Sequence, residues 1–78
     1  MKIEELEIGP ESAVRCNLTM LLTARGMTLS KLSELVNVSI VNLSILKNNK
    51  ARAIRFSTLE AICKALDCEI GDLLVLSK

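Results

Sequence analysis

The chain has 78 residues, with 10 lysines and arginines against 9 aspartates and glutamates, and half of its residues are hydrophobic. That length allows one small domain. Because there is no His, Trp or Tyr and only one Phe, the core must be built from aliphatic side chains, which suits packed helices. The same absences exclude Ser-His and Cys-His nucleophile pairs and His-bearing metal sites. We therefore expect no enzyme, no metal and no other cofactor.

The three cysteines, Cys16, Cys63 and Cys68, point to a reducing compartment. They are odd in number and lack CxxC spacing, so we interpret them as small apolar side chains rather than a disulfide framework or a zinc site. The longest apolar runs are about four residues, far short of the roughly 20 that cross a bilayer. The N-terminal sequence also lacks the regions of a secretory signal. We expect a soluble, cytoplasmic protein with no membrane partner.

Charge is unevenly distributed along the chain. Residues 1–15 hold Lys2 and Arg15 against four glutamates, a sum of −2, so the remaining residues sum to +3. The stretch 47–55 carries four cations, Lys47, Lys50, Arg52 and Arg55, and no acidic residue. A polyanion is the natural partner of such a stretch, and a solvated loop is the alternative.

The first residues form a separate acidic segment. They include the only proline, and the spacing of Ile3, Leu6 and Ile8 fits neither a strand nor a helix. We therefore predict an N-terminal extension over 1–13 and a single domain over 14–78.

Apolar residues recur at helical spacing through the domain and predict an all-α, compact five-helix fold. In chain order the predicted helices cover 17–25, 29–36, 40 to 47 or 48, 58–66, and a short last segment from residue 70. The start of the fourth predicted helix is assigned to a capping box, Ser57-Thr58-Leu59-Glu60. Residues 48–55 are interpreted as a partly extended loop. The apolar ends, Val14-Arg15 and Val75-Leu76, can pair as short strands.

Two of these helices, separated by three residues, match the helix-turn-helix plan. Thr28 or Ser30 can cap the first helix and Ser39 the second. Asn37 stands where the turn needs a left-handed backbone. With Leu43 in the core, residues 41, 44, 45 and 48 face outward, toward a major groove.

The sequence resembles the lambda-repressor-like Cro/CI (Xre-type) helix-turn-helix regulators, specifically their short single-domain members. The resemblance covers about Val14 to Leu76. It is carried by Arg15-Cys16-Asn17-Leu18, Val38-Ser39, Asn42-Leu43-Ser44, residues 50–59 and Gly71-Asp72-Leu73-Leu74. It implies a DNA-binding fold whose third helix reads the major groove, and hence a sequence-specific transcriptional regulator of double-stranded DNA, here a repressor.

From this resemblance we predict two sets of interface residues. The base-reading set is Ser39, Ile40, Val41, Asn42, Ser44, Ile45 and Asn48. The phosphate-contacting set is Thr28, Lys31, Lys47, Lys50, Arg52 and Arg55. Arg52 or Arg55 can instead cap carbonyls or pair with Glu60. Since one such module buries only about 600–1,000 Å² on DNA, we also expect a homodimer. Candidate dimer surfaces are Ile3, Leu6, Ile8, Ile70, Leu73, Leu74 and Leu76.

Apolar residues on the third helix leave a second hypothesis open. Ile40 and Ile45 occupy positions that are commonly polar or basic in the family, and exposed apolar residues also hold protein partners. The alternative is a protein-interaction module of the same fold, such as an antirepressor or antitoxin component. RNA and single-stranded DNA are disfavoured as partners, because one Phe offers no stacking platform.

Overall fold

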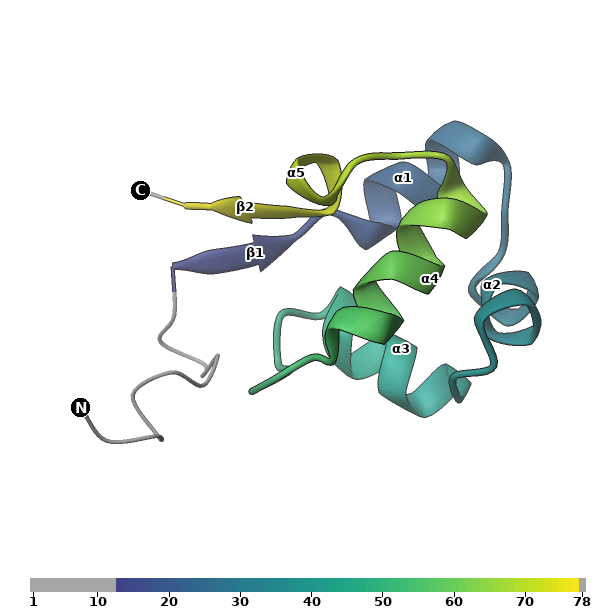
Figure 1. Ribbon diagram of the computed structural model, residues 1–78, viewed down its shortest axis with the longest axis horizontal. Coiled ribbons are helices and arrows are strands. Elements are labelled where there is room, and N and C mark those ends of the chain that lie inside the picture. The colour runs from purple at the N-terminus through teal and green to yellow at the C-terminus, as the bar shows by residue number, and fades with distance from the viewer. Residues whose placement is uncertain (1–12, 78) are drawn as a thin grey trace.

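The computed structural model describes residues 13–77, which form five helices and a two-stranded antiparallel sheet (Figure 1). The elements are β1 (Val14–Cys16), α1 (Leu18–Arg25), α2 (Leu29–Val36), α3 (Ile40–Lys47), α4 (Phe56–Leu66), α5 (Ile70–Leu73) and β2 (Leu74–Leu76). The predicted five-helix fold is confirmed. None of the helices in this part of the chain could span a membrane alone, although α2 and α3, bent by 117° where they join, pass the length and apolarity test as a pair.

The strand pairing joins the two ends of the domain. Val14 lies opposite Leu76 and Arg15 opposite Val75, so the predicted pairing of the chain ends is confirmed. The pairing of β1 and β2, which we call the strand ribbon, extends one residue further, because the Ser77 N–H donates to the Ala13 carbonyl over 2.6 Å. Residues 1–12, which hold most of the predicted acidic extension, lie outside the described residues.

The core is almost entirely leucine and isoleucine, as an aliphatic composition requires. Helices α1 to α5 all contribute to it, and Figure 1 shows α4 in the middle of the molecule, in front of α3. The buried residues are Leu18, Leu21, Leu22, Leu32, Leu43, Leu46, Leu59, Ile62, Cys63, Leu66 and Leu73. In the described chain no polar or charged residue is buried. The three cysteines are free thiols, of which Cys63 is buried and the other two are half-buried.

Left-handed residues end α1, α2 and α4. Gly26 (φ 62°), Asn37 (φ 56°) and Asp67 (φ 50°) follow these helices directly. The α4 end is closed further by Arg25, whose guanidinium donates to the carbonyls of Leu66 (2.6 Å) and Asp67 (2.9 Å). This bond ties the end of α1 to the end of α4, and thus fixes two helices that lie far apart in sequence.

The predicted start of the fourth helix is wrong. Helix α4 begins at Phe56, two residues early, and its N-cap is Arg55, which makes no side-chain capping bond. The expected capping box does not form, because Ser57 lies inside the helix and not at its N-cap, and Glu60 pairs with Lys64 over 2.8 Å. A capping bond is found at α5 instead, where the Glu69 N–H donates to the Asp72 carboxylate over 2.9 Å.

Candidate nucleic-acid interface

Helices α2 and α3 form the helix-turn-helix unit. Their directions differ by 117°, within the range of about 90–120° that this motif shows. The Thr28 hydroxyl accepts from the Lys31 N–H (3.0 Å) and the Ser39 hydroxyl from the Asn42 N–H (3.1 Å), so both predicted caps are present. Within the turn Asn37 is left-handed as expected. The two helices are therefore held at a fixed angle by local bonds.

A side-chain hydrogen bond from α2 also stabilises the turn between α2 and α3. The Ser33 hydroxyl donates to the Val38 carbonyl over 2.6 Å, a bond that only a small hydroxyl residue can make where the helices approach. Leu43 and Leu46 are buried, and Val38 packs against the same core. One side of α3 is thus anchored and its other side is presented to solvent.

The solvent side of α3 is largely apolar. Val41 is 68% exposed, Ile40 47% and Ile45 41%. The polar residues on this side are Ser44, which is half-buried, and the exposed Asn48, whose side-chain amide donates to the Ser44 hydroxyl over 3.4 Å. The predicted outward direction of residues 41, 44, 45 and 48 agrees with this exposure.

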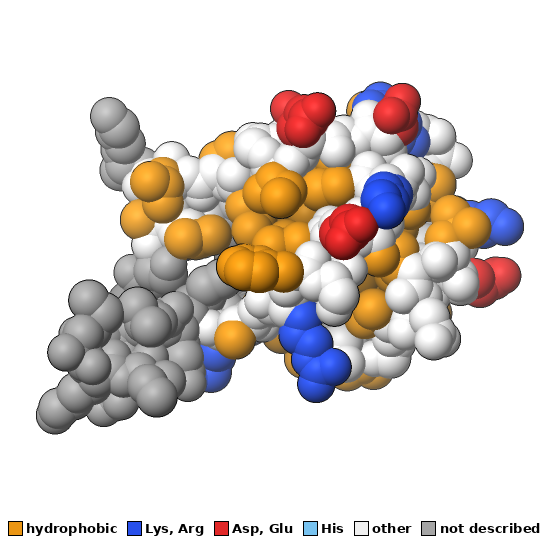
Figure 2. Space-filling model, viewed as in Figure 1, with side chains coloured by type: hydrophobic (Ala, Val, Ile, Leu, Met, Phe, Trp, Pro, Cys, Tyr) orange, Lys and Arg blue, Asp and Glu red, His pale blue; other side chains and the backbone are white. Residues whose placement is uncertain are grey.

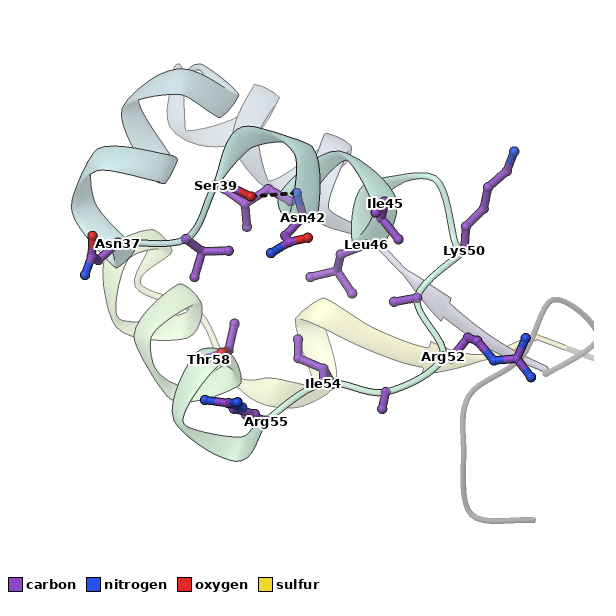
Figure 3. Close-up of a pocket in the computed structure, with 14 residues that line it drawn as sticks. Asn37, Ser39, Asn42, Ile45, Leu46, Lys50, Arg52, Ile54, Arg55 and Thr58 are labelled. Atoms are coloured by element: carbon purple, nitrogen blue, oxygen red, sulfur yellow. Dashed lines mark hydrogen bonds between the residues drawn. The ribbon is translucent and has the colours of Figure 1, made fainter. Parts of the chain in front are cut away.

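A hollow of about 770 Å³ lies between α3, the loop 48–55 and the start of α4 (Figure 3). We call it the α3–loop hollow. Six predicted site residues line it, namely Ser39, Asn42, Ile45, Lys50, Arg52 and Arg55. In Figure 3 the Asn42 side chain points into the hollow, across from Ile54 and Thr58, whereas Lys50 extends away from it. The structure therefore brings base-reading and phosphate-contacting candidates around one concavity.

The other predicted site residues lie outside this hollow. Ile40, Val41, Ser44 and Asn48 lie on α3 itself, and Lys47 is half-buried in its last turn. Thr28 and Lys31 stand at the start of α2.

The cationic loop is joined to the strand ribbon by Asn49. This residue is left-handed (φ 61°), and its side-chain oxygen accepts from the Cys16 N–H over 2.7 Å. Sequence reasoning missed this contact, since the partners are 33 residues apart and neither carries a local signal. Asn49 fixes the point at which the loop leaves α3, and so helps to set the positions of Lys50 and Arg52.

The uncapped first turn of α4 is a second feature that sequence reasoning missed. Arg55 precedes it without a capping bond, and both Arg55 and Thr58 line the α3–loop hollow. Unpaired amides at a helix N-terminus and the positive end of its dipole attract anions. The sequence signal for this uncapped turn is the arginine at the N-cap position, where Ser, Thr, Asp or Asn is usual.

A different surface lies between α4 and α5. A shallower hollow there, of about 490 Å³, has Phe56 (87% exposed) and Ile70 (54% exposed) on its lining. Apolar side chains gather over α4, α5 and the strand ribbon in Figure 2. The Glu60–Lys64 pair also borders it, and Lys64 lowers the pKa of the Glu60 carboxyl through their hydrogen bond and its charge.

The comparisons with known proteins agree with this geometry. Residues 17–78 match the model of the Cro/C1-type HTH DNA-binding domain. The HTH-type transcriptional regulator YozG of Bacillus subtilis strain 168 is 56% identical over 62 residues, which make up 80% of this chain and 74% of that protein. The crystal structure of the transcriptional regulator VanUg (form II) has a TM-score of 0.69 at 34% identity, over 85% of this chain and 88% of that one. The chain therefore belongs to the Cro/C1-type helix-turn-helix family of DNA-binding transcriptional regulators, as the resemblance of its motifs indicated.

Proposed function

We propose that this regulator is a sequence-specific repressor that inserts α3 into the major groove of double-stranded DNA. The observation that carries the proposal is the position of the solvent side of α3 beside an acid-free cationic loop. No acidic residue occurs between residues 35 and 59, while that stretch contains Lys47, Lys50, Arg52 and Arg55. A helix without charge repulsion, flanked by cations, suits a groove lined by phosphates.

Phosphates on either side of the groove would be held by different elements. On one side Lys50, Arg52 and Arg55 surround the α3–loop hollow, next to the uncapped first turn of α4. On the other side Thr28 begins α2 with Lys31 in its first turn. The Thr28 oxygen already accepts a capping bond, and its O–H hydrogen remains able to donate to a phosphate oxygen. These contacts fix orientation and register, and sequence is left to α3.

We further propose that the protein acts as a homodimer, because one such module covers too little DNA for useful specificity. Two of the candidate dimer residues named above, Ile70 and Leu76, are exposed, at 54% and 75%. Leu73 is fully buried and Leu74 half-buried, so these two residues are corrected to core and core-edge positions. The exposed Phe56 beside Ile70 supports placing the dimer surface at the α4–α5 hollow.

The role is that of a binding protein in the cytoplasm, where bacterial DNA is accessible, and no catalytic step is proposed. Support comes from the side-chain chemistry. The chain has no His, and among the described residues no cluster of Cys, Asp and Glu could hold a metal.

Selection of duplexes from a random library tests the proposal directly. The full chain is immobilised, bound duplexes are amplified over several rounds at low salt, and a reporter gene then carries the selected site over its promoter. A repressor yields an enriched site and lowers reporter output in proportion to occupancy. An enriched site with raised reporter output would refute only the repressor role. Absence of any enriched duplex would refute sequence-specific DNA binding. The stoichiometry of the complex is measured by sedimentation, and a value of one chain per operator would refute the dimer.

The exposed apolar residues of α3 favour one alternative function. Ile40, Val41 and Ile45 could seat a protein instead of DNA, as in an antirepressor or antitoxin component. Retention on heparin or random duplex at low salt distinguishes the two, because only the DNA-binding role requires the cations of the loop to be engaged.

A further inference from the structure

The solvent side of α3 lacks the groups that read G·C base pairs. Guanine is read mostly by Arg or Lys at O6 and N7, and the cytosine amino group by a carboxylate. Residues 40–46 contain no Arg, Lys, Asp or Glu. Lys47 is the one cation of α3, and it lies about 110° around the helix from the direction shared by Val41 and Asn48. It is therefore turned away from a groove that these two residues face.

The cations of the loop do not supply the missing readers of G·C base pairs. Lys50 follows α3 by three residues, and its side chain extends away from the α3–loop hollow (Figure 3). Arg52 and Arg55 lie further along the loop, beside the start of α4. Their places suit the phosphate backbone, so base edges are left to the uncharged side of the helix.

That side does match A·T base pairs. Thymine carries a C5 methyl group in the major groove, which apolar side chains contact, and Val41 and Ile45 are 68% and 41% exposed. Adenine presents an N6 donor beside an N7 acceptor, which an asparagine amide can bond with both of its ends. Asn48 is exposed and shares the outward direction of Val41, whereas Asn42 points into the α3–loop hollow (Figure 3).

We propose that the half-site facing α3 consists of A·T base pairs, recognised through thymine methyls against Val41 and Ile45 and an adenine edge bonded by Asn48. This inference rests on the proposed DNA-reading function and adds to it the class of sequence that is read. It also explains how a recognition helix with apolar positions can remain a DNA reader.

The first experiment is the random-duplex selection, examined for base composition. The expected half-site contains a run of A·T pairs flanked by positions without preference. Enrichment of G·C pairs at the centre of each half-site would overturn this inference and leave DNA reading intact. Absence of any enriched duplex would overturn both.

The second experiment removes single methyl groups from the selected duplex. Each thymine is replaced in turn by uracil, which lacks only the C5 methyl group, and the Kd is measured by fluorescence anisotropy. Burial of one such group corresponds to about 0.8 kcal/mol, so a contacted thymine should give about fourfold weaker binding. In Val41→Ala the uracil effect should vanish at one position, whereas Leu35→Ala, which truncates an exposed leucine on α2, should keep it. Uracil substitutions without effect at every position would overturn the methyl contacts.

The third experiment examines the adenine edge. Replacing each adenine by 7-deazaadenine removes the N7 acceptor, and loss of a two-point contact should weaken binding roughly 5- to 150-fold, the ratio that about 1–3 kcal/mol represents. Asn48→Ala should remove this sensitivity at one adenine and leave the uracil effects of Val41 in place. Sensitivity that persists in Asn48→Ala at every adenine would overturn the role of Asn48.

Discussion

The salt dependence of DNA binding should show that Lys50 contacts phosphate. Each cation that neutralises a phosphate on duplex DNA contributes about 0.9 to the slope of log K against log salt concentration. With Lys50, Arg52 and Arg55 engaged in both copies of a dimer, the slope from these residues is about −5.4. Lys50→Gln removes one contact from each copy, so the slope should fall to about −3.6. Between 50 and 200 mM salt, these loop contacts should then account for a drop in affinity of about three orders of magnitude in the wild type and about two in the variant.

A matched variant separates phosphate contact from loss of net charge. Lys64→Gln makes the same change in charge on an exposed lysine of α4, where the side chain pairs with Glu60. Because this pair borders the α4–α5 hollow, sedimentation first establishes that the variant keeps the oligomeric state of the wild type. Fluorescence anisotropy over a salt series, with the selected duplex and with random duplex, should give the wild-type slope for Lys64→Gln and a reduced slope for Lys50→Gln on both DNAs. Ser44→Ala should keep the slope and change only the preference between duplexes. Equal slopes for the two lysine variants would refute the assignment of Lys50 to a phosphate.

Four further outcomes are expected. Asn37→Ala should lower stability by about 1–2 kcal/mol, because alanine resists the left-handed backbone there, while Asn37→Gly should cost much less; thermal melting compares the two. Asn49→Gly should cost about 0.5–1.5 kcal/mol through the lost bond to Cys16, and Asn49→Ala more, since it adds backbone strain. The pKa of the Glu60 carboxyl is lowered in the folded state, so its contribution to stability is present above the unfolded pKa and is lost as pH falls through the folded pKa. Glu60→Gln should therefore make the free energy of unfolding depend less steeply on pH in the acid range, as measured by acid denaturation. A chain starting at Ala13 should melt as cooperatively as the full chain, as it keeps the ribbon bond to Ser77; a broad, non-cooperative melt would place the first residues in the core.

Local signals predicted the helix-turn-helix unit well because its caps lie within three residues of the amides that they bond. Thr28, Ser39 and Asn37 all act as their types and positions indicated. The same kind of signal misled at α4, where Ser57 and Glu60 have capping-box spacing. There Glu60 forms an ion pair one turn ahead, and the helix starts two residues early. Ser57 therefore stands inside the helix, where it cannot act as the N-cap.

Tertiary packing placed the remaining parts of the site. The direction of the α3 side chains followed from 3.6-residue periodicity once Leu43 was assigned to the core. The α3–loop hollow could not be predicted, because its shape depends on where α4 begins and on the Asn49 bond to β1. Met20 shows the same limit, since it lies in α1 next to the buried Leu21 and its own side chain is 59% exposed. Periodicity assigns a face, and only the neighbouring helices decide whether that face is covered.

A formal net charge of +1 is no argument against DNA binding here, because the charge that matters is local. Electrostatic attraction between exposed groups is largely screened beyond about 10 Å at 0.1 M salt. Glu60 is paired with Lys64, and Asp67, Glu69 and Asp72 follow the far end of α4, an 11-residue helix about 16 Å long, so these acidic side chains offset little of the field at the loop. Within the stretch 35–59 the four cations meet no acid at all. The loop can thus supply affinity for any duplex, and the uncharged side of α3 can discriminate between duplexes without adding to the salt dependence.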